Sequence, residues 1–287
     1  MVFPQTEIGA DPHVIRKYAK GVERAGFEHL VAYDHVLGHH PEDPGAWANL
    51  GPYTDEHAFH EVLVLFSHLA AITTRIEFAT EVLVLPQRQT VLVAKQAAEI
   101  QLLSGGRLRL GIGVGWNPEE FRALGMSFHD RGQRVVEQVD ILRRLWRGEL
   151  ITVNGHFHDI RSGAVNPPPP QPIPIWVGGS ASVALKRAAA IADGFMLQHS
   201  LEEAPAVIGA LRAHLLENGR DPVTFGLEAR IRLRENDLHR ALDEARSWQQ
   251  VGATHLSVNT MDAGIKDPVH HLELARAFMT AWVRSRK

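Results

Sequence analysis

The 287-residue chain contains no cysteine, and this absence excludes several kinds of site. Without cysteine there is no disulfide framework, no thiolate metal site and no cysteine nucleophile. Neither sign of charge is in large excess. The chain has 30 Lys and Arg residues and 33 Asp and Glu residues, which gives a formal net charge of −3. A nearly neutral chain offers no broad basic surface, so we expect no nucleic-acid partner.

Long hydrophobic runs are absent too. No run approaches the roughly 18 apolar residues that a membrane-spanning helix needs. The N-terminal MVFPQTEIG has no basic segment followed by an apolar one, so it is not typical of a signal peptide. We expect a cytoplasmic protein with no membrane partner. The 17 histidines include His39-His40 and His156/His158, but no carboxylates converge on these pairs in the sequence, so we expect no metal site.

A regular alternation of strand-like and helix-like segments is present. Ile76–Leu85 and Leu108–Val114 are apolar runs, and Val91–Leu103 between them has apolar residues at helical spacing. Gly105-Gly106 ends that helix, because glycine adopts a left-handed C-terminal cap at little cost. Two strands joined by one helix form a βαβ unit, the building block of parallel sheets.

Eight strand–helix units can be counted along the chain. The strands are expected at 2–4, 29–33, 76–85, 108–114, 175–177, 194–197, 225–231 and 255–258. Asn154-Gly155 predicts a two-residue turn in an inserted hairpin over 151–160. The count favours an α/β fold, a (β/α)8 TIM barrel with insertion segments, as a single domain over residues 1–287.

Two polar segments are candidates, one at the end of a predicted strand and one late within another, and barrel enzymes place their chemistry at strand ends. Asp34-His35 follows the second strand, and a histidine beside a carboxylate can exchange a proton with a substrate. A capped strand end with a surface histidine is the alternative. Thr80-Glu81-Val82 places an acid in an apolar strand. Either Glu81 points inward to a buried arginine or backbone donor, or the segment is a bulge that braces a planar ligand.

Two glycine-rich segments are further candidates. Gly178-Gly179-Ser180 opens a helix, whose free N–H groups favour an anion, although a plain tight turn explains the glycines equally well. In Gly113–Asn117, the large ring of Trp116 either lines a ligand pocket or seals the top of the barrel.

Several of these segments, taken in order, resemble the bacterial luciferase-like superfamily, and within it the branch of coenzyme F420-dependent oxidoreductases. They are Tyr33-Asp34-His35, Ala79-Thr80-Glu81-Val82-Leu83, Ser104-Gly105-Gly106-Arg107, Gly111–Trp116 and Ile175–Ser180. The combination SGGR…LGxGxGW is specific to the superfamily, and the matches span nearly the whole chain.

The resemblance implies an enzyme that moves a hydride between C5 of the deazaflavin F420 and a small organic substrate. Asp34 and His35 would be catalytic, with Asp34 holding His35. The cofactor-binding residues would be Thr80, Glu81 and Val82, with a cis peptide at Glu81–Val82 behind the ring, then Gly115, Trp116 and Asn117, and Gly178, Gly179 and Ser180 near the phosphate. The resemblance also implies a homodimer that associates through its second and third helices.

The chain departs from relatives in three places. Flavin-using relatives place an arginine where this chain has Val114-Gly115, and its absence favours F420 over FMN. The family's glucose-6-phosphate dehydrogenases carry a catalytic glutamate at Trp116 and a tryptophan at His39. The alternatives are an FMN-dependent two-component monooxygenase and a non-catalytic F420- or flavin-binding protein. We expect the segments 36–58 and 151–160 to shape the substrate pocket.

Overall fold

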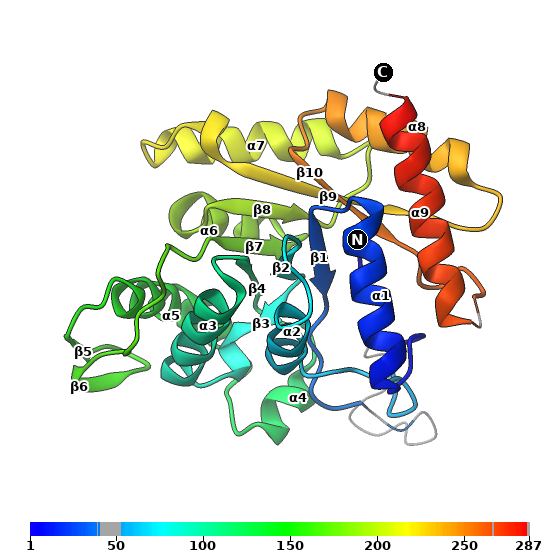
Figure 1. The fold of residues 1–287 in the computed structure, drawn as a ribbon. Coiled ribbons are helices and arrows are strands. Elements are labelled where there is room, and N and C mark those ends of the chain that lie inside the picture. Colours follow the sequence, from blue (N-terminus) through cyan, green and yellow to red (C-terminus); the bar gives the residue numbers. More distant parts are fainter. Residues whose placement is uncertain (39, 41–52, 266, 286–287) are drawn as a thin grey trace.

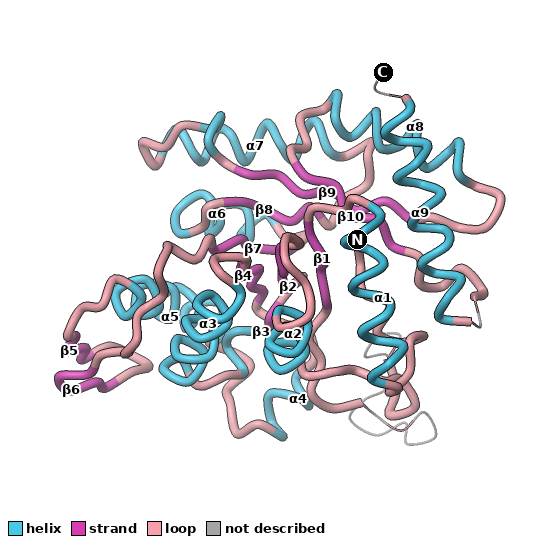
Figure 2. Tube along the Cα trace, in the orientation of Figure 1, coloured by secondary structure: helices cyan, strands magenta, loops and turns pink. Residues whose placement is uncertain are grey.

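Parallel strands at the centre of the molecule are surrounded by helices (Figure 1). The computed structural model describes residues 1–38, 40, 53–265 and 267–285. His39 and most of the predicted pocket segment 36–58 therefore lie outside the described residues. Figure 2 shows the strands in magenta between helices in cyan, the arrangement that the alternating sequence predicts.

The parallel strands run in the order β1-β2-β4-β7-β8-β9-β10, with β3 also paired to β4. Their bounds are β1 His29–Ala32, β2 Glu77–Thr80, β3 Leu83–Val84, β4 Leu108–Gly113, β7 Ile175–Gly179, β8 Gly194–Leu197, β9 Gly226–Arg232 and β10 His255–Asn259. The helices are α1 Pro12–Ala25, α2 Val62–Ala70, α3 Thr90–Ser104, α4 Pro118–Ala123, α5 Arg131–Trp146, α6 Ser182–Ile191, α7 Ala204–Glu217, α8 Leu238–Gln250 and α9 Pro268–Arg284.

The first residues of the chain occupy the remaining position between β1 and β10. Val2 pairs in parallel with Val31, and its N–H donates to the carbonyl of Val258 at 2.8 Å. Phe3 N–H donates to Val31 O at 2.8 Å. The predicted first strand is thus reduced to a bridge, because Pro4 has no N–H to continue the ladder. The predicted (β/α)8 barrel is confirmed.

The predicted third strand, 76–85, is divided into β2 and β3. Both pieces pair with β4, in the registers Phe78↔Leu108 and Leu83↔Ile112. The Glu81–Val82 peptide between them is cis, as the resemblance implied.

Helix ends follow the sequence signals. Asp11 accepts the N–H of His13 at 2.8 Å and caps α1, whose first residue is Pro12. Gly26 and Gly105 end α1 and α3 in the left-handed conformation, with φ of 96° and 72°. No helix among the residues described is long and apolar enough to cross a membrane.

A buried ion network crosses the barrel interior near the start of the strands. Arg109 Nη1 lies 2.7 Å from Glu228 Oε2, and Arg109 Nε lies 2.8 Å from Glu77 Oε1. The other oxygen of Glu228 lies 2.9 Å from His29 Nε2. The guanidinium also lies over the ring of Trp176, 4.3 Å from its centroid. These contacts join β1, β2, β4, β7 and β9 at the end of the barrel where the strands begin. The end where the strands finish is not occupied by this network.

The hairpin consists of β5 Ile151–Asn154 and β6 Asp159–Gly163. Asn154 pairs with Asp159, so four residues connect the strands, and the predicted two-residue turn is wrong. Glu137 of α5 accepts the N–H groups of His156 and Phe157 and so supports the longer connection. In Figure 1 the hairpin lies at the left edge beside α5, away from α4, so it does not shape a pocket near α4.

Candidate active site

The candidate site lies at the carboxyl ends of the strands, toward which the arrow of β1 points in Figure 1 and where α4 lies. The segments that follow β1, β2 and β4 meet here. Parallel α/β barrels build their active sites at this end.

Asp34 does not hold His35. Its Oδ1 accepts Arg88 Nη2 at 2.7 Å, and its Oδ2 accepts the N–H of Val84 at 2.9 Å. Arg88 is also paired with Glu61 at 2.7 Å. Successive side chains of an extended segment point in opposite directions, so the two neighbours diverge. The predicted Asp34–His35 pair is therefore wrong, and Asp34 joins the end of β1 to the residues after β3.

Glu120 is the partner of His35, and the sequence interpretation missed it. Its Oε1 lies 3.3 Å from His35 Nδ1 and accepts the N–H groups of Val36 at 2.8 Å and Leu37 at 3.2 Å. Burial raises the pKa of Glu120, but His35 and these two amides outweigh burial and lower the pKa overall. An ionised carboxylate only accepts hydrogen bonds, so Nδ1 carries the proton in this contact.

Asn117 places Glu120. The Asn117 side-chain oxygen accepts the N–H groups of Glu119 at 3.0 Å and Glu120 at 3.3 Å, so it caps α4. Pro118 occupies the first helical position. The oxygen of this predicted cofactor-binding residue is thus committed to the helix. The Asn-Pro-Glu-Glu sequence was the available signal for Glu120, since it marks a helix start directly after a strand end.

Aromatic rings surround His35. Its ring centroid lies 4.9 Å from that of Tyr53, 5.0 Å from that of Phe59 and 5.6 Å from that of Trp116. Trp116 remains 43% exposed, so it forms a wall of the mouth rather than a closed seal. The other ring nitrogen, Nε2, has no hydrogen-bond partner in the part of the chain that the structure describes.

Glu81 points into the barrel and meets a buried arginine, one of the two alternatives from the sequence. Its Oε1 lies 3.3 Å from Arg230 Nη1, and burial raises the pKa of Glu81 to about 7 despite this partner. Thr80, one residue earlier, donates its hydroxyl to Gly111 O at 2.6 Å. Thr80 therefore links β2 to β4.

Val82 brings the ends of three strands together. A Cβ at Gly113 would lie 2.4 Å from Val82 Cγ2, and a Cβ at Gly178 would lie 2.7 Å from Val82 Cγ1. Both glycines are therefore needed for this close approach. The predicted residues Val82 and Gly178 thus lie side by side.

An arginine pair lies beside the predicted phosphate segment. Arg131 Nε, from the first turn of α5, donates to Gly115 O at 3.2 Å. Burial and the nearby charge of Arg131 lower the pKa of Arg187, on α6. Neither guanidinium has a carboxylate partner among the described residues. The absence of an arginine at Val114-Gly115 therefore no longer favours F420 over FMN, because Arg131 of α5 contacts the same loop.

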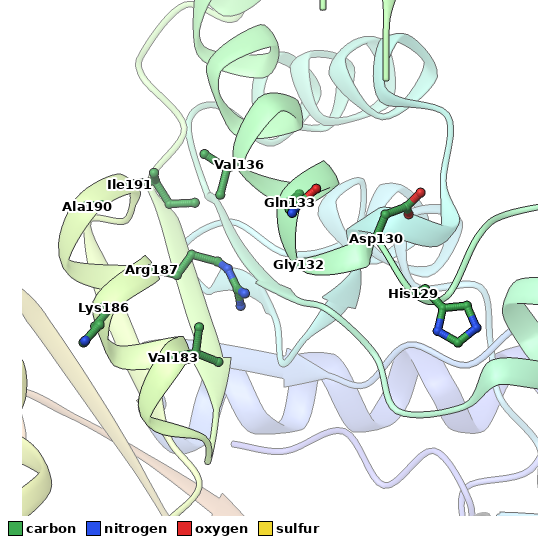
Figure 3. A pocket seen from close by; sticks show the side chains of 10 residues that line it. All are labelled: His129, Asp130, Gly132, Gln133, Val136, Val183, Lys186, Arg187, Ala190 and Ile191. Carbon is green, nitrogen blue, oxygen red and sulfur yellow. The ribbon is translucent and has the colours of Figure 1, made fainter. Parts of the chain in front are cut away.

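Arg187 of this pair lines a groove of about 610 Å³ between α5 and α6 (Figure 3). Arg187 extends from α6 toward Gly132 of α5, where an added Cβ would lie 2.9 Å from Arg187 Nη2. Helix α6 begins two residues after Ser180, and Ala181 offers no side-chain cap to its first amides. Guanidinium groups without a carboxylate partner, together with uncapped amides, suit an anion.

Comparisons with known proteins agree with this architecture. A protein of unknown function from Mycobacterium tuberculosis is 40% identical over 204 residues, 68% of this chain and 69% of that protein. An F420-dependent glucose-6-phosphate dehydrogenase from Beutenbergia cavernae is 26% identical over 96% of this chain and 79% of its own length. The solved structure of a coenzyme F420-dependent tetrahydromethanopterin reductase from Methanopyrus kandleri shares the fold with a TM-score of 0.78, at 14% identity over 100% of this chain and 98% of that one. The family described as luciferase-like monooxygenase matches residues 2–279, so this chain belongs to that family.

Proposed function

We propose that the protein is a coenzyme F420-dependent oxidoreductase that transfers a hydride between the deazaflavin C5 and a small organic substrate. One observation carries the proposal: the proton-bearing Nδ1 of His35 faces the buried Glu120 at 3.3 Å, at the mouth of a luciferase-like barrel. The F420-dependent dehydrogenase similar to this chain over 96% of its length supports the same cofactor here.

The residues present fit this cofactor. Arg131, Arg187 and the Gly178–Ser180 segment would hold its phosphate, since two guanidinium groups without carboxylate partners are otherwise costly to half-bury. Thr80–Val82 would support one side of the ring, and Gly115 and Trp116 would form the wall beside it. The cofactor supplies the hydride acceptor and donor, and the protein supplies orientation and electrostatics.

His35 would move the proton that accompanies the hydride. With Nδ1–H directed at Glu120, the lone pair of Nε2 can accept the hydroxyl proton of an alcohol while its carbon loses a hydride and becomes a carbonyl. In the reverse direction the protonated ring returns that proton to the carbonyl oxygen. Glu120 keeps the Nδ1–H side of the ring in place in both directions, so that Nε2 stays available to the substrate.

His35→Gln tests this role. Removing a general acid–base group lowers turnover by about 10²–10⁴-fold. We expect a loss of that size in F420 reduction, followed by F420 absorbance over a panel of alcohols, while the dissociation constant for F420 stays within about threefold. His57→Gln is the matched control. The ring centroid of His57 lies 6.2 Å from that of Tyr53, and His57 has no ring contact with His35 among the described residues. Wild-type turnover in His35→Gln would remove His35 from the chemistry.

A second candidate is an FMN-dependent two-component monooxygenase. It is favoured by Arg131, whose Nε lies 3.2 Å from Gly115 O, in the loop where flavin-using relatives carry an arginine. Direct titration with both cofactors separates the two candidates.

We also propose that the protein is a homodimer that associates through α2 and α3. Large apolar side chains on these helices are exposed, among them Val64 at 65%, Leu92 at 52% and Leu103 at 60%. A second copy of the same face would cover them, as isologous interfaces do.

A further inference from the structure

Arginines occur at every second position from Arg230 to Arg234, along the end of β9 and beyond it toward the barrel mouth. Glu228 and Arg230 point inward, because Glu228 contacts Arg109 and Arg230 contacts Glu81. Arg232 is the last residue of β9, and Arg234 follows two residues later. The strand pairing continues past Arg232, since Leu233 N–H donates to Asn259 O at 2.8 Å. Alternation therefore places Arg232 and Arg234 on the same side as Arg230, progressively farther out.

The two outer arginines have no acidic partner. Both are exposed, and no hydrogen bond or ion pair joins either side chain to another described residue. The acids nearby are already paired, because Arg240 Nε lies 2.6 Å from Asp237 and Arg240 Nη1 lies 2.7 Å from Glu244. Arg240 Nη2 also donates to the backbone O of Arg232 at 3.0 Å, which fixes the strand end.

These groups line a pocket of about 380 Å³. Its lining residues are Arg230, Arg232, Arg234, Asp237, Arg240 and Glu244. Four cations stand against two anions, and both anions bind the same arginine. The remaining positive charge suits an oxyanion, which arginine binds through paired N–H groups.

Tyr53 connects this pocket to His35. Its ring centroid lies 4.9 Å from that of His35. Burial raises the pKa of Tyr53, and the charge of Asp262 adds to this effect. The charges of Arg230 and Arg232 oppose it, so both guanidinium groups lie within electrostatic range of the Tyr53 hydroxyl. A ligand on Arg232 is therefore near the reacting end of the barrel.

The pocket is separate from the arginine pair assigned to the cofactor. Arg131 and Arg187 lie on α5 and α6, next to the end of β7. The arginines of this pocket lie at the end of β9 and in the residues after it into α8, and β8 lies between β7 and β9 in the sheet. Two separate groups of arginines without enough acidic partners are thus present, and a single phosphate group could contact only one of them.

We propose that the substrate carries an oxyanion, a carboxylate or a phosphate, which Arg232 and Arg234 bind while its reacting carbon lies at His35. The reaction at His35 in this proposal rests on the proposed function, whereas the anion site does not depend on it. It narrows the small organic substrate to an acidic hydroxy or carbonyl compound.

The test is calorimetric titration of the F420-saturated protein with inorganic phosphate and, separately, with succinate. We expect at least one of the two to bind the wild type, and Arg232→Met/Arg234→Met to raise its dissociation constant at least tenfold, since charge-assisted pairs are the strong ones. Methionine keeps an apolar stem of similar length. The control Arg246→Met/Arg276→Met removes the same charge from exposed positions on α8 and α9 and should bind like the wild type.

The two anions separate the possible ligand groups. Phosphate binding alone indicates a phosphate ester, and succinate binding alone indicates a carboxylic acid. Equal binding in the wild type and Arg232→Met/Arg234→Met, or binding of neither anion to the wild type, overturns the proposal. F420 binding is measured first by fluorescence. If F420 does not bind, the proposed function fails, and the same titrations on the free protein still test the anion site.

Discussion

At the residue scale, the site depends on which carboxylate faces His35. The sequence places Asp34 beside it, but the alternation of an extended chain turns Asp34 toward Arg88 and Val84. Glu120, 85 positions away, takes that place. Strand ends identified His35 correctly as a residue of the mouth. The Asn-Pro-Glu-Glu sequence marks the start of the helix that carries Glu120, but that local pattern does not specify which residue Glu120 faces.

Glu120→Gln should change how stability depends on pH. The pKa of Glu120 is lowered in the folded protein, so its contribution to stability is present above its ordinary pKa and is lost as pH falls through the folded-state value. The wild type should therefore exceed Glu120→Gln in melting temperature by more at pH 7 than at about pH 4. Glu273→Gln, an exposed acid on α9, should show no such trend. Parallel pH curves for wild type and Glu120→Gln would contradict the assignment.

Asp34→Asn should act on stability rather than on chemistry. Removing one member of a buried ion pair costs about 3 kcal/mol or more, because the remaining charge stays buried. Arg88 would keep Glu61 as its partner, which limits the loss to the lower end of that range. Denaturant unfolding measures the loss, and single-turnover rates on the folded fraction should stay within about threefold of wild type. If Asp34→Asn had wild-type stability but lost turnover, Asp34 would have a catalytic role instead.

At the scale of elements, the alternation of strand and helix patterns predicted the order of the barrel strands. Gly105 ends α3 as expected, and Asp11 and Gly26 cap α1 with residue types that suit those positions. Two local details required tertiary contacts. The break between β2 and β3 lies inside one apolar run, and the hairpin connection is longer than its Asn-Gly signal because Glu137 binds its amides.

Gly111→Ala tests the close approach of β2 and β4. A Cβ at this position would lie 1.9 Å from the carbonyl oxygen of Thr80, which is backbone and cannot rotate away. We expect a loss of more than about 2 kcal/mol in the free energy of unfolding. Gly209→Ala is the control, because nothing lies within 4 Å of its Cβ position in α7. That substitution should stabilise the protein by about 1 kcal/mol. Equal effects would contradict the packing described.

At the scale of the whole molecule, the barrel closes through Val2 and Phe3, and two faces remain for partners. The mouth is the proposed site for small molecules, and the α2–α3 face is the proposed interface with a second copy of the chain. Composition could exclude a cysteine-based site and a broad nucleic-acid surface, but only the arrangement of helices shows which apolar side chains stay exposed.

Leu103→Glu should weaken the proposed dimer. Leu103 is 60% exposed, so a charge there costs the monomer little and is costly in an apolar interface. Sedimentation velocity should show a dimer for the wild type and a shift toward monomer for the variant. Leu216→Glu on α7, at a residue 65% exposed, is the control and should remain dimeric. A wild-type monomer at all concentrations would refute the dimer.

The cofactor is the central claim, and fluorescence titration of the purified protein with F420 and with FMN tests it most directly. We predict that F420 binds with a micromolar dissociation constant and that FMN binds at least about tenfold more weakly, a difference of about 1.4 kcal/mol. Arg131→Met/Arg187→Met should weaken F420 binding, because these guanidinium groups have no other anionic partner among the described residues. Micromolar binding of FMN with no binding of F420 would contradict the account.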